Sequence, residues 1–155
     1  MWVLDWGHLW KGCVLMEIVI YGEPIPQGRP RFANGHAYEP QRSKNYKLLV
    51  RFWVTQYLKK IPGWKPFENA LCVDLTFYMG IPSSWAKQKR IGAIQGQIRP
   101  TSKRFGDLDN MVKCVTDAIS GLVYVDDSQI VNLGASKYYS DTPRCVLKVI
   151  ELENK

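Results

Sequence analysis

Apolar and polar positions alternate along the chain with two different periods, and these periods predict its strands and helices. Short β-branched or alternating runs predict strands over about residues 17–21, 71–79, 129–139 and 145–152. Apolar residues spaced three and four apart predict helices over residues 43–58 and 107–120, and a shorter helix over residues 84–94, capped by Ser83 or Ser84. This order of elements predicts an α+β fold, with a small mixed four-stranded sheet and helices packed on one face.

The segments between these elements carry turn signals. Residues 22–30 contain three prolines and two glycines, which predicts a loop. Asn34-Gly35 predicts a tight turn with a short return strand over residues 36–38. Residues 140–143 are expected to form the turn between the last two strands, and the segment 99–104 is expected to be mobile.

The helix predicted over residues 107–120 has one apolar stripe, and Gly121 supplies its C-terminal stop. The stripe consists of Leu108, Met111, Val112, Val115, Ala118, Ile119 and Leu122. The polar side carries Asp109, Lys113 and Asp117 at i, i+4 and i+8. For the helix alone, the ordinary interpretation is a solvated face with an ion pair and Asp107 as the N-cap.

The composition indicates one globular domain, which we expect over residues 16–155. With 155 residues, of which 46% are hydrophobic, the chain can bury a core and is too apolar for intrinsic disorder. Residues 1–15 carry Trp2, Trp6 and Trp10 in a run too short and too charged to span a bilayer, without the features of a signal peptide. This extension is interpreted as a hydrophobic helix packed on the domain. Alternatively, translation begins at Met16.

The cysteines and histidines form no metal or disulfide pattern. Cys13, Cys72, Cys114 and Cys145 are widely spaced, and neither histidine lies at zinc-finger spacing from them. We therefore expect buried, reduced thiols and a cytoplasmic protein. The sequence has no basic amphipathic helix or lipid anchor, so no membrane partner is expected, and no organic cofactor is expected either.

Charge is distributed unevenly along the chain, which carries a net charge of +7 and has a pI of about 9.3. Residues 29–104 contain 15 Lys and Arg against three acidic residues. Residues 106–130 instead contain five aspartates and one lysine. A cationic surface around a group of carboxylates indicates a polyanion partner and a metal site, a combination that points to nucleic-acid chemistry.

The aspartates occupy two neighbouring segments. Asp107 and Asp109 lie at the N-terminus of the predicted helix, where the helix dipole favours anions. Asp126 and Asp127 begin a strand one short connection later, so we expect the two acidic ends to meet. Converging carboxylates need a cation between them, and oxygen ligands suit Mg²⁺ or Mn²⁺, which activate water for attack on a phosphate. Lys113, one turn after Asp109, is placed to steady the phosphate oxygens.

Two of these motifs closely resemble those of the RusA family of Holliday junction resolvases. The first is D-L-D-N-M-V-K from Asp107 to Lys113, and the second is D-D-S-Q-I-V from Asp126 to Val131. The run I-P-Q-G-R-P-R-F at residues 25–32 also resembles an N-terminal motif of the family. The run K-Y-Y at residues 137–139 resembles the end of the third strand in family members. The resemblance covers residues 16–152.

The resemblance implies a homodimeric, Mg²⁺-dependent endonuclease that nicks two opposing strands of a four-way DNA junction. It implies that Asp107, Asp109 and Asp127 hold the metal and that Lys113 is catalytic. Asp126 corresponds to an acidic neighbour and is kept as a further candidate ligand. Strand alternation directs only one of Asp126 and Asp127 to the site without deciding which, and the resemblance favours Asp127.

Basic residues outside these motifs are expected to bind DNA. Arg29 and Arg31, held by Pro30, are candidates for phosphate contacts, the alternative being a basic loop that only aids solubility. The other candidates on this surface are Lys103, Arg104 and Lys137.

Three further positions bear on DNA binding. Phe32 and Trp85 are candidates to wedge at the junction centre, although Trp85 is equally a candidate for the core. Gly106 departs from the family pattern, because many members have Lys, Arg or Pro there. Arg104 is expected to supply the missing charge through the flexible glycine.

Two other functions use parts of the same pattern. A nucleotide-sugar transferase also binds metal through D-x-D, but its fold needs a Gly-rich strand-to-helix turn, which this sequence does not offer. A non-catalytic junction-binding protein would use the carboxylates for structure. Replacing Asp109 by Asn separates these classes, because only a nuclease would lose cleavage while it keeps junction binding.

Overall fold

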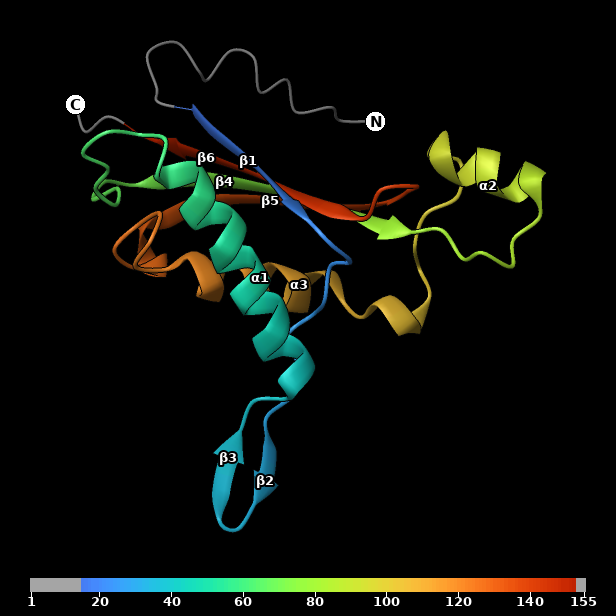
Figure 1. The fold of residues 1–155 in the computed structure, drawn as a ribbon, viewed down its shortest axis with the longest axis horizontal. Coiled ribbons are helices and arrows are strands. Elements are labelled where there is room, and N and C mark those ends of the chain that lie inside the picture. Colours follow the sequence, from blue (N-terminus) through green and yellow to red (C-terminus); the bar gives the residue numbers. More distant parts are fainter. Residues whose placement is uncertain (1–14, 153–155) are drawn as a thin grey trace.

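The structure is a computed structural model that describes residues 15–152, and it has the α+β fold that the sequence predicts. Within these residues the strands are β1 (Leu15–Tyr21), β2 (Arg31–Ala33), β3 (His36–Tyr38), β4 (Leu71–Gly80), β5 (Ile130–Ser140) and β6 (Arg144–Glu151). The helices are α1 (Gln41–Leu58), α2 (Lys87–Ile94) and α3 (Leu108–Ile119). Figure 1 shows α1 and α3 on one side of the sheet, with β2 and β3 projecting away from the body.

Four strands form a mixed sheet in the order β1-β6-β4-β5. β6 pairs antiparallel with both β1 and β4, whereas β4 and β5 run parallel. Every second residue of β4 is buried, from Leu71 to Met79, and the residues between them are partly exposed. The two-residue period of the strand therefore supplies one apolar face for the helices.

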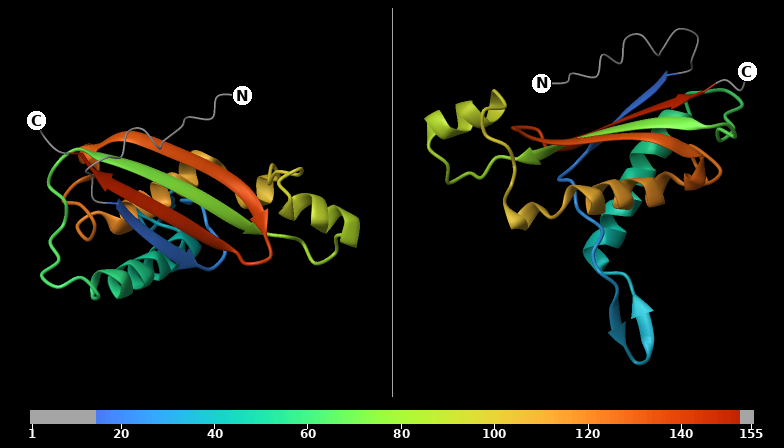
Figure 2. Two further views of the ribbon diagram at one scale, coloured as in Figure 1. Left: turned by 90° about the horizontal axis from the view of Figure 1, so that it is seen from above. Right: turned by 180° about the vertical axis from the view of Figure 1, so that it is seen from behind.

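Helices α1 and α3 cover this apolar face (Figure 2). Their buried side chains include Tyr46, Val50 and Val54 of α1 and Met111, Val115 and Ile119 of α3. Each such side chain contributes about 1.5–3 kcal/mol through its burial, which is enough to fix α3 firmly on the sheet. A hydrogen bond of 2.9 Å from Arg51 Nη1 to the Ala118 carbonyl also joins the two helices.

Helix α2 differs from the prediction in its start and in its place. It begins at Lys87 after the N-cap residue Ala86, which forms no side-chain cap, so the predicted caps Ser83 and Ser84 are wrong. A turn occupies this position instead, closed by a hydrogen bond from the Trp85 N–H. α2 also lies beyond the end of the sheet, where it contacts β5, and does not pack on the helical face (Figure 1).

The segments predicted as turns and loops have defined contacts. Asn34 and Gly35 have φ values of 52° and 78°, the left-handed conformations that a two-residue hairpin turn requires. In the segment expected to be mobile, Arg99 stacks on Tyr138 at 3.9 Å from the ring centre. The same segment runs into a one-turn 3-10 helix, Lys103–Phe105, which buries the ring of its last residue.

Residues 1–14 of the predicted N-terminal extension, including Cys13, lie outside the described residues. A start at Met16 therefore stays a prediction. Cys114 and Cys145 are buried thiols, as expected, whereas Cys72 is only partly buried. Burial raises the pKa of Cys114 to about 11. Over residues 15–152, no helix combines the length and the apolar character needed to cross a membrane.

Candidate active site

Helix α3 carries the first group of predicted site residues at its N-terminus. Asp107 is the N-cap residue, with an extended backbone (φ −85°, ψ 145°), and its side chain forms no capping hydrogen bond. Asp109 lies in the first turn. Both are exposed, and neither carboxylate hydrogen-bonds or pairs with another residue in the part of the chain that the structure describes. Both carboxylates are therefore available to a ligand where the helix dipole stabilises negative charge.

The chain enters this turn through Gly106, whose conformation other residues rarely adopt. Its φ of 77° and ψ of −179° fall in a region that is essentially restricted to glycine. A Cβ atom here would lie 2.5 Å from Cγ of Pro26, so the proline-rich loop packs directly against the glycine. The Gln27 N–H also donates to the Asn110 carbonyl at 2.8 Å. Gly106 is therefore fixed by packing and is not the flexible link that was expected.

Lys137, a predicted DNA contact, has a protein partner in the structure. Its Nζ donates to the Gly106 carbonyl at 3.1 Å, and the side chain is partly buried. The lysine therefore holds the peptide that precedes Asp107. Its role in DNA binding stays a prediction.

Asp126 and Asp127 lie in a turn, whereas the start of a strand was predicted. Asp126 is the N-cap of a one-turn 3-10 helix, Asp127–Gln129, and its carboxylate accepts a hydrogen bond of 2.9 Å from the Ser128 N–H. Hydrogen bonds from the hydroxyl and N–H of Ser128 hold the pKa of Asp126 below its usual value. Because neither aspartate is in a strand, alternation does not choose between them. Asp126 caps the turn, and Asp127 lines a groove.

Buried contacts fix this turn relative to α3. Tyr124 is fully buried, and its hydroxyl donates to the Thr116 carbonyl at 2.8 Å. Gln129 Nε2 donates to the Phe67 carbonyl at 2.9 Å. These contacts fix the turn that carries Asp127 beside α3.

The groove lies between α3 and β5 and has a volume of about 640 Å³. Its polar lining includes Asp109, Lys113, Asp117 and Asp127, and its apolar lining includes Leu108, Val112, Leu133 and Ala135. Two of the predicted metal ligands and the predicted catalytic lysine therefore share one groove.

The two acidic ends share this groove. Asp109 on α3 and Asp127 on the 3-10 turn both line it. Over residues 15–152, no three or more His, Cys, Asp or Glu side chains lie close enough together to hold one metal ion. Residues from both acidic ends thus line one groove, but the described residues form no three-carboxylate cluster.

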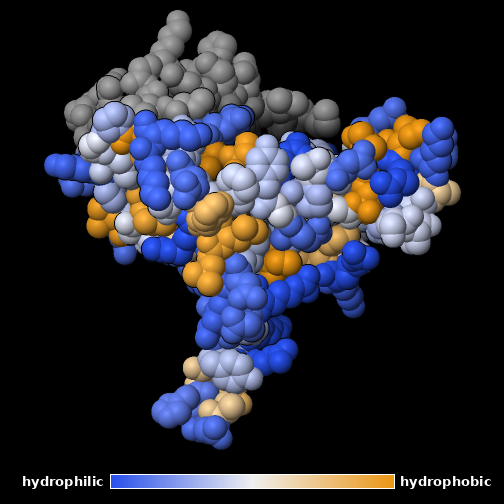
Figure 3. All heavy atoms as spheres, viewed as in Figure 1, coloured by the Kyte–Doolittle hydropathy of each residue, from blue (hydrophilic) through white to orange (hydrophobic). Residues whose placement is uncertain are grey.

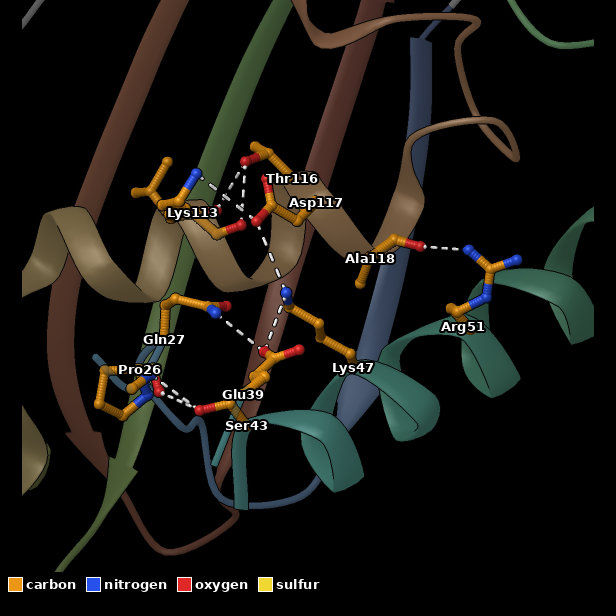
Figure 4. Close-up of polar contacts among 12 residues, drawn as sticks. Pro26, Gln27, Glu39, Ser43, Lys47, Arg51, Lys113, Thr116, Asp117 and Ala118 are labelled. Atoms are coloured by element: carbon orange, nitrogen blue, oxygen red, sulfur yellow. Dashed lines mark hydrogen bonds and ion pairs between the residues drawn. The ribbon is translucent and has the colours of Figure 1, made fainter. Parts of the chain in front are cut away.

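A chain of charged contacts connects the polar face of α3 to α1 (Figure 4). Asp117 Oδ2 lies 3.6 Å from Lys113 Nζ and 3.5 Å from Lys47 Nζ. Lys47 Nζ is in turn 3.0 Å from Glu39 Oε1. Partial burial raises the pKa of Glu39, but hydrogen bonds with Lys47 and Gln27 outweigh it, so the pKa is below its usual value. The expected ion pair on α3 is therefore part of a larger network.

The other predicted DNA-binding residues are exposed. Arg29 and Arg31 lie on the β2–β3 hairpin and its approach, and Lys103 and Arg104 lie in the 3-10 turn before Gly106. Sequence reasoning missed Arg42, which lines one cavity with Arg29 and Arg31 and a second cavity with Arg104. The signal that could have found it is a cation in the first turn of a helix, where the dipole disfavours positive charge.

The two candidate wedge residues differ in their surroundings. Phe32 is 79% exposed on β2. Trp85 packs edge-to-face against Tyr139, with 5.1 Å between ring centres, and Lys89 Nζ lies 3.9 Å from the Trp85 ring centre. Trp85 is therefore a packing residue, and Phe32 stays a candidate.

The sequence is similar to a known protein family and to a bacterial protein. Residues 21–150 match the family described as Endodeoxyribonuclease RusA. The chain is also 38% identical over 143 residues to the uncharacterized protein YqaN of Bacillus subtilis (strain 168), a match that covers 88% of this chain and 96% of that protein. The family match includes the proline-rich loop, the hairpin, α3 and the Asp127 turn. The chain therefore belongs to the RusA endodeoxyribonuclease family.

Proposed function

We propose that this protein is a Mg²⁺-dependent endonuclease that resolves four-way DNA junctions by paired nicks, in recombination and repair of DNA in the cytoplasm. The observation that carries the proposal is the groove lined by Asp109, Lys113 and Asp127, in a chain of an endodeoxyribonuclease family. The exposed Lys103 and Arg104 lie in the turn just before α3. The basic surface attracts the DNA backbone, and the carboxylates supply the site of hydrolysis.

The proposed ligands suit Mg²⁺, with Mn²⁺ as a substitute. Asp107, Asp109 and Asp127 offer oxygen atoms only, and Mg²⁺ is usually bound by one or two carboxylates together with water and substrate phosphates. Asp126 is less suited, because its carboxylate already caps the Ser128 N–H. When bound, the ion activates water and neutralises charge that develops on the phosphate.

Lys113 is the proposed partner of the phosphate oxygens. Its side chain is 62% exposed and lines the groove, and its ion pair with Asp117 is long, at 3.6 Å. An exposed pair of this kind contributes little to stability, so a phosphate can take the place of Asp117 at low cost. Asp117 thereby keeps the lysine over the groove before DNA binds.

The exposed edge of β5 supports a homodimer in which each site draws on both copies. β5 is an edge strand of the sheet, and Asp127 precedes it directly. β5 carries two exposed apolar side chains, Val131 (63%) and Leu133 (49%), and Val125 (59%) is exposed in the connection before it. A free edge with exposed apolar residues suits pairing with a second copy. We propose that Asp127 of one copy completes the site begun by Asp109 of the other.

Mixing two inactive variants tests this shared site. Asp109→Asn and Asp127→Asn are each expected to be inactive as homodimers, because each change damages both sites. A heterodimer of the two variants would carry both changes in one site and leave the other site intact. The mixture should therefore regain single nicks in a labelled junction without paired cuts. If native mass spectrometry shows heterodimers but nicking does not return, each site lies within one chain.

Lys137→Met is expected to reduce junction cleavage about 10-fold, because it removes the hydrogen bond that holds the Gly106 carbonyl. Junction binding should change little. Two quantities are measured: the cleavage rate, and the slope of log binding constant against log salt concentration (the salt slope). Loss of one phosphate contact lowers the size of the salt slope by about one. Lys148→Met is the control, because Lys148 pairs with Glu17 on the opposite face of the sheet. A lower salt slope with normal cleavage would make Lys137 a direct DNA contact instead.

Binding without cleavage separates the proposed function from its alternatives. With Ca²⁺ in place of Mg²⁺, the protein is expected to retain a labelled four-way junction in the presence of excess linear duplex. A non-catalytic binding protein would bind the junction equally well but would not nick it after Mg²⁺ is added. A nucleotide-sugar transferase would not bind the junction. Equal competition by junction and duplex would contradict structure selectivity.

A further inference from the structure

The β2–β3 hairpin stands clear of the rest of the molecule (Figures 1 and 3). All residues from Arg29 to Tyr38 are exposed, and within residues 15–152 no other element covers either face of the hairpin. A two-stranded hairpin that contributes nothing to the core adds little to stability on its own. The aromatic and basic residues of the hairpin are therefore better explained by contact with a binding partner than by a role in stability.

Phe32 is the most exposed large apolar side chain in the described part of the chain, at 79%. In the hairpin register it lies opposite Ala37, so a methyl group is the only side chain directly across from its ring. Arg31 lies opposite Tyr38 on the other face. One face of the hairpin therefore presents a bare aromatic ring, and the other presents a guanidinium beside a phenol.

The base of the hairpin forms a cationic cavity of about 350 Å³. Arg29, Arg31 and Arg42 line it, and none of the described residues in its lining is acidic. Arg42 also lines a second cavity, together with Arg104, Phe105 and Glu23. Planar guanidinium groups match the oxygens of a phosphate with two parallel hydrogen bonds, so the cavity suits a backbone phosphate.

Hydrogen bonds fix the direction in which the hairpin points. Before the hairpin, the Gln27 N–H bonds the Asn110 carbonyl of α3, and the Gly28 N–H bonds the hydroxyl of buried Ser43 at 2.8 Å. After it, Glu39 pairs with Lys47 (Figure 4). The hairpin is thus tied to α1 at both ends and to α3, which carries Asp109 and Lys113, at its start. A fixed arm binds with a smaller entropic cost than a mobile loop.

We propose that the hairpin is a branch-point probe: the arginine cavity holds a DNA phosphate, and the Phe32 ring stacks on a base that is exposed where the strands exchange. The inference rests on the proposed function and deepens it, since it names the part of the substrate that the hairpin contacts. An aromatic ring stacks on any base, so the contact selects an unstacked base and not a sequence. Linear duplex offers no such base, and the hairpin thereby favours junctions.

The test uses four-way junctions with 2-aminopurine at the crossover or in the middle of one arm, with Ca²⁺ in place of Mg²⁺. The full chain should change the fluorescence of the crossover probe and leave the arm probe unchanged. Phe32→Ala should abolish this change and weaken junction binding about 10-fold or more, with duplex binding unaffected. Phe32→Trp should retain both properties, because it keeps an aromatic face.

Phe52→Ala is the matched control, because Phe52 is an exposed phenylalanine (53%) on α1, away from the hairpin. It should behave as the unmodified protein. Arg42→Ala should weaken binding to junctions and lower the salt slope by about one, without loss of the fluorescence change at saturation.

If the full chain cleaves junctions and Phe32→Ala matches it in fluorescence, affinity and rate, the branch-point probe is wrong and the proposed function stands. If the full chain neither binds nor cleaves junctions, the proposed function fails and this inference fails with it. Circular dichroism of each variant verifies folding, and Phe32→Leu provides a second variant that keeps apolar bulk but removes the ring.

Discussion

Asp109→Asn is expected to reduce junction cleavage by at least about 100-fold and to leave junction binding intact. Asn has nearly the same shape as Asp but lacks the negative charge that would hold Mg²⁺. Asp109 is exposed in the first turn of α3 and lines the groove, so the change removes no packing. Binding should stay equal or become tighter, because one carboxylate no longer repels the phosphates.

Single-turnover cleavage of a labelled junction gives the rate, and gel shifts in Ca²⁺ give the affinity. Asp141→Asn is the matched control, since Asp141 is an exposed aspartate that pairs with Arg90 at 3.2 Å, outside the groove. It should cleave at the normal rate. Normal cleavage by Asp109→Asn would mean that the groove between α3 and β5 is not the active site.

Among substitutions that leave every charged group unchanged, Gly106→Ala is expected to cause the largest loss of junction cleavage. The φ and ψ values of Gly106 cost other residues about 1–3 kcal/mol, and a Cβ would also collide with Pro26 at 2.5 Å. The backbone must shift to relieve the collision, and it would carry Asp107 and the first turn of α3 with it. Because a displacement of about 1 Å at a catalytic group can cost 100-fold, cleavage should fall by about that factor.

Gly96→Ala is the control for the glycine change. Gly96 also has a positive φ of 76°, but it has open space around its Cβ position and follows α2, away from the groove. Both variants should lower the midpoint of thermal unfolding, measured by circular dichroism, whereas only Gly106→Ala should lose cleavage. Equal cleavage by the two variants would show that the packing of Pro26 on Gly106 does not position the site.

The parts of the fold that follow from local pattern were predictable. The alternation along β4 and the apolar stripe of α3 gave the sheet and its covering helix, since each period places apolar residues on one face. The Asn34-Gly35 turn was also predictable, because few other residues accept left-handed conformations at both positions.

The errors arose where tertiary contacts decide between local alternatives. Ser83 and Ser84 are good capping residues, but α2 starts three residues later, after a turn that packs Trp85 against Tyr139. Asp126 resembled the start of a strand, but its carboxylate and the Gln129 side chain form a capping box that makes a 3-10 turn. In both places, side-chain contacts outweigh the intrinsic preference of a short segment.

The groove residues on α3 were predictable from the sequence, but their arrangement was not. The spacing of Asp109, Lys113 and Asp117 on one helix face gave three of the groove residues directly. The contacts that orient them come from segments distant in sequence, such as Lys47 on α1. Helical periodicity carries no information on such contacts, because they depend on how the elements dock.

The most direct test of the proposed function is the cleavage of a synthetic four-way junction, labelled on each strand in turn, with Mg²⁺ and with EDTA. We expect symmetric nicks in two opposing strands near the crossover, with no nicks in matched linear duplex and none in EDTA. Cleavage of duplex and junction at equal rates, or an intact junction in Mg²⁺, would contradict the assignment of this chain as a junction resolvase.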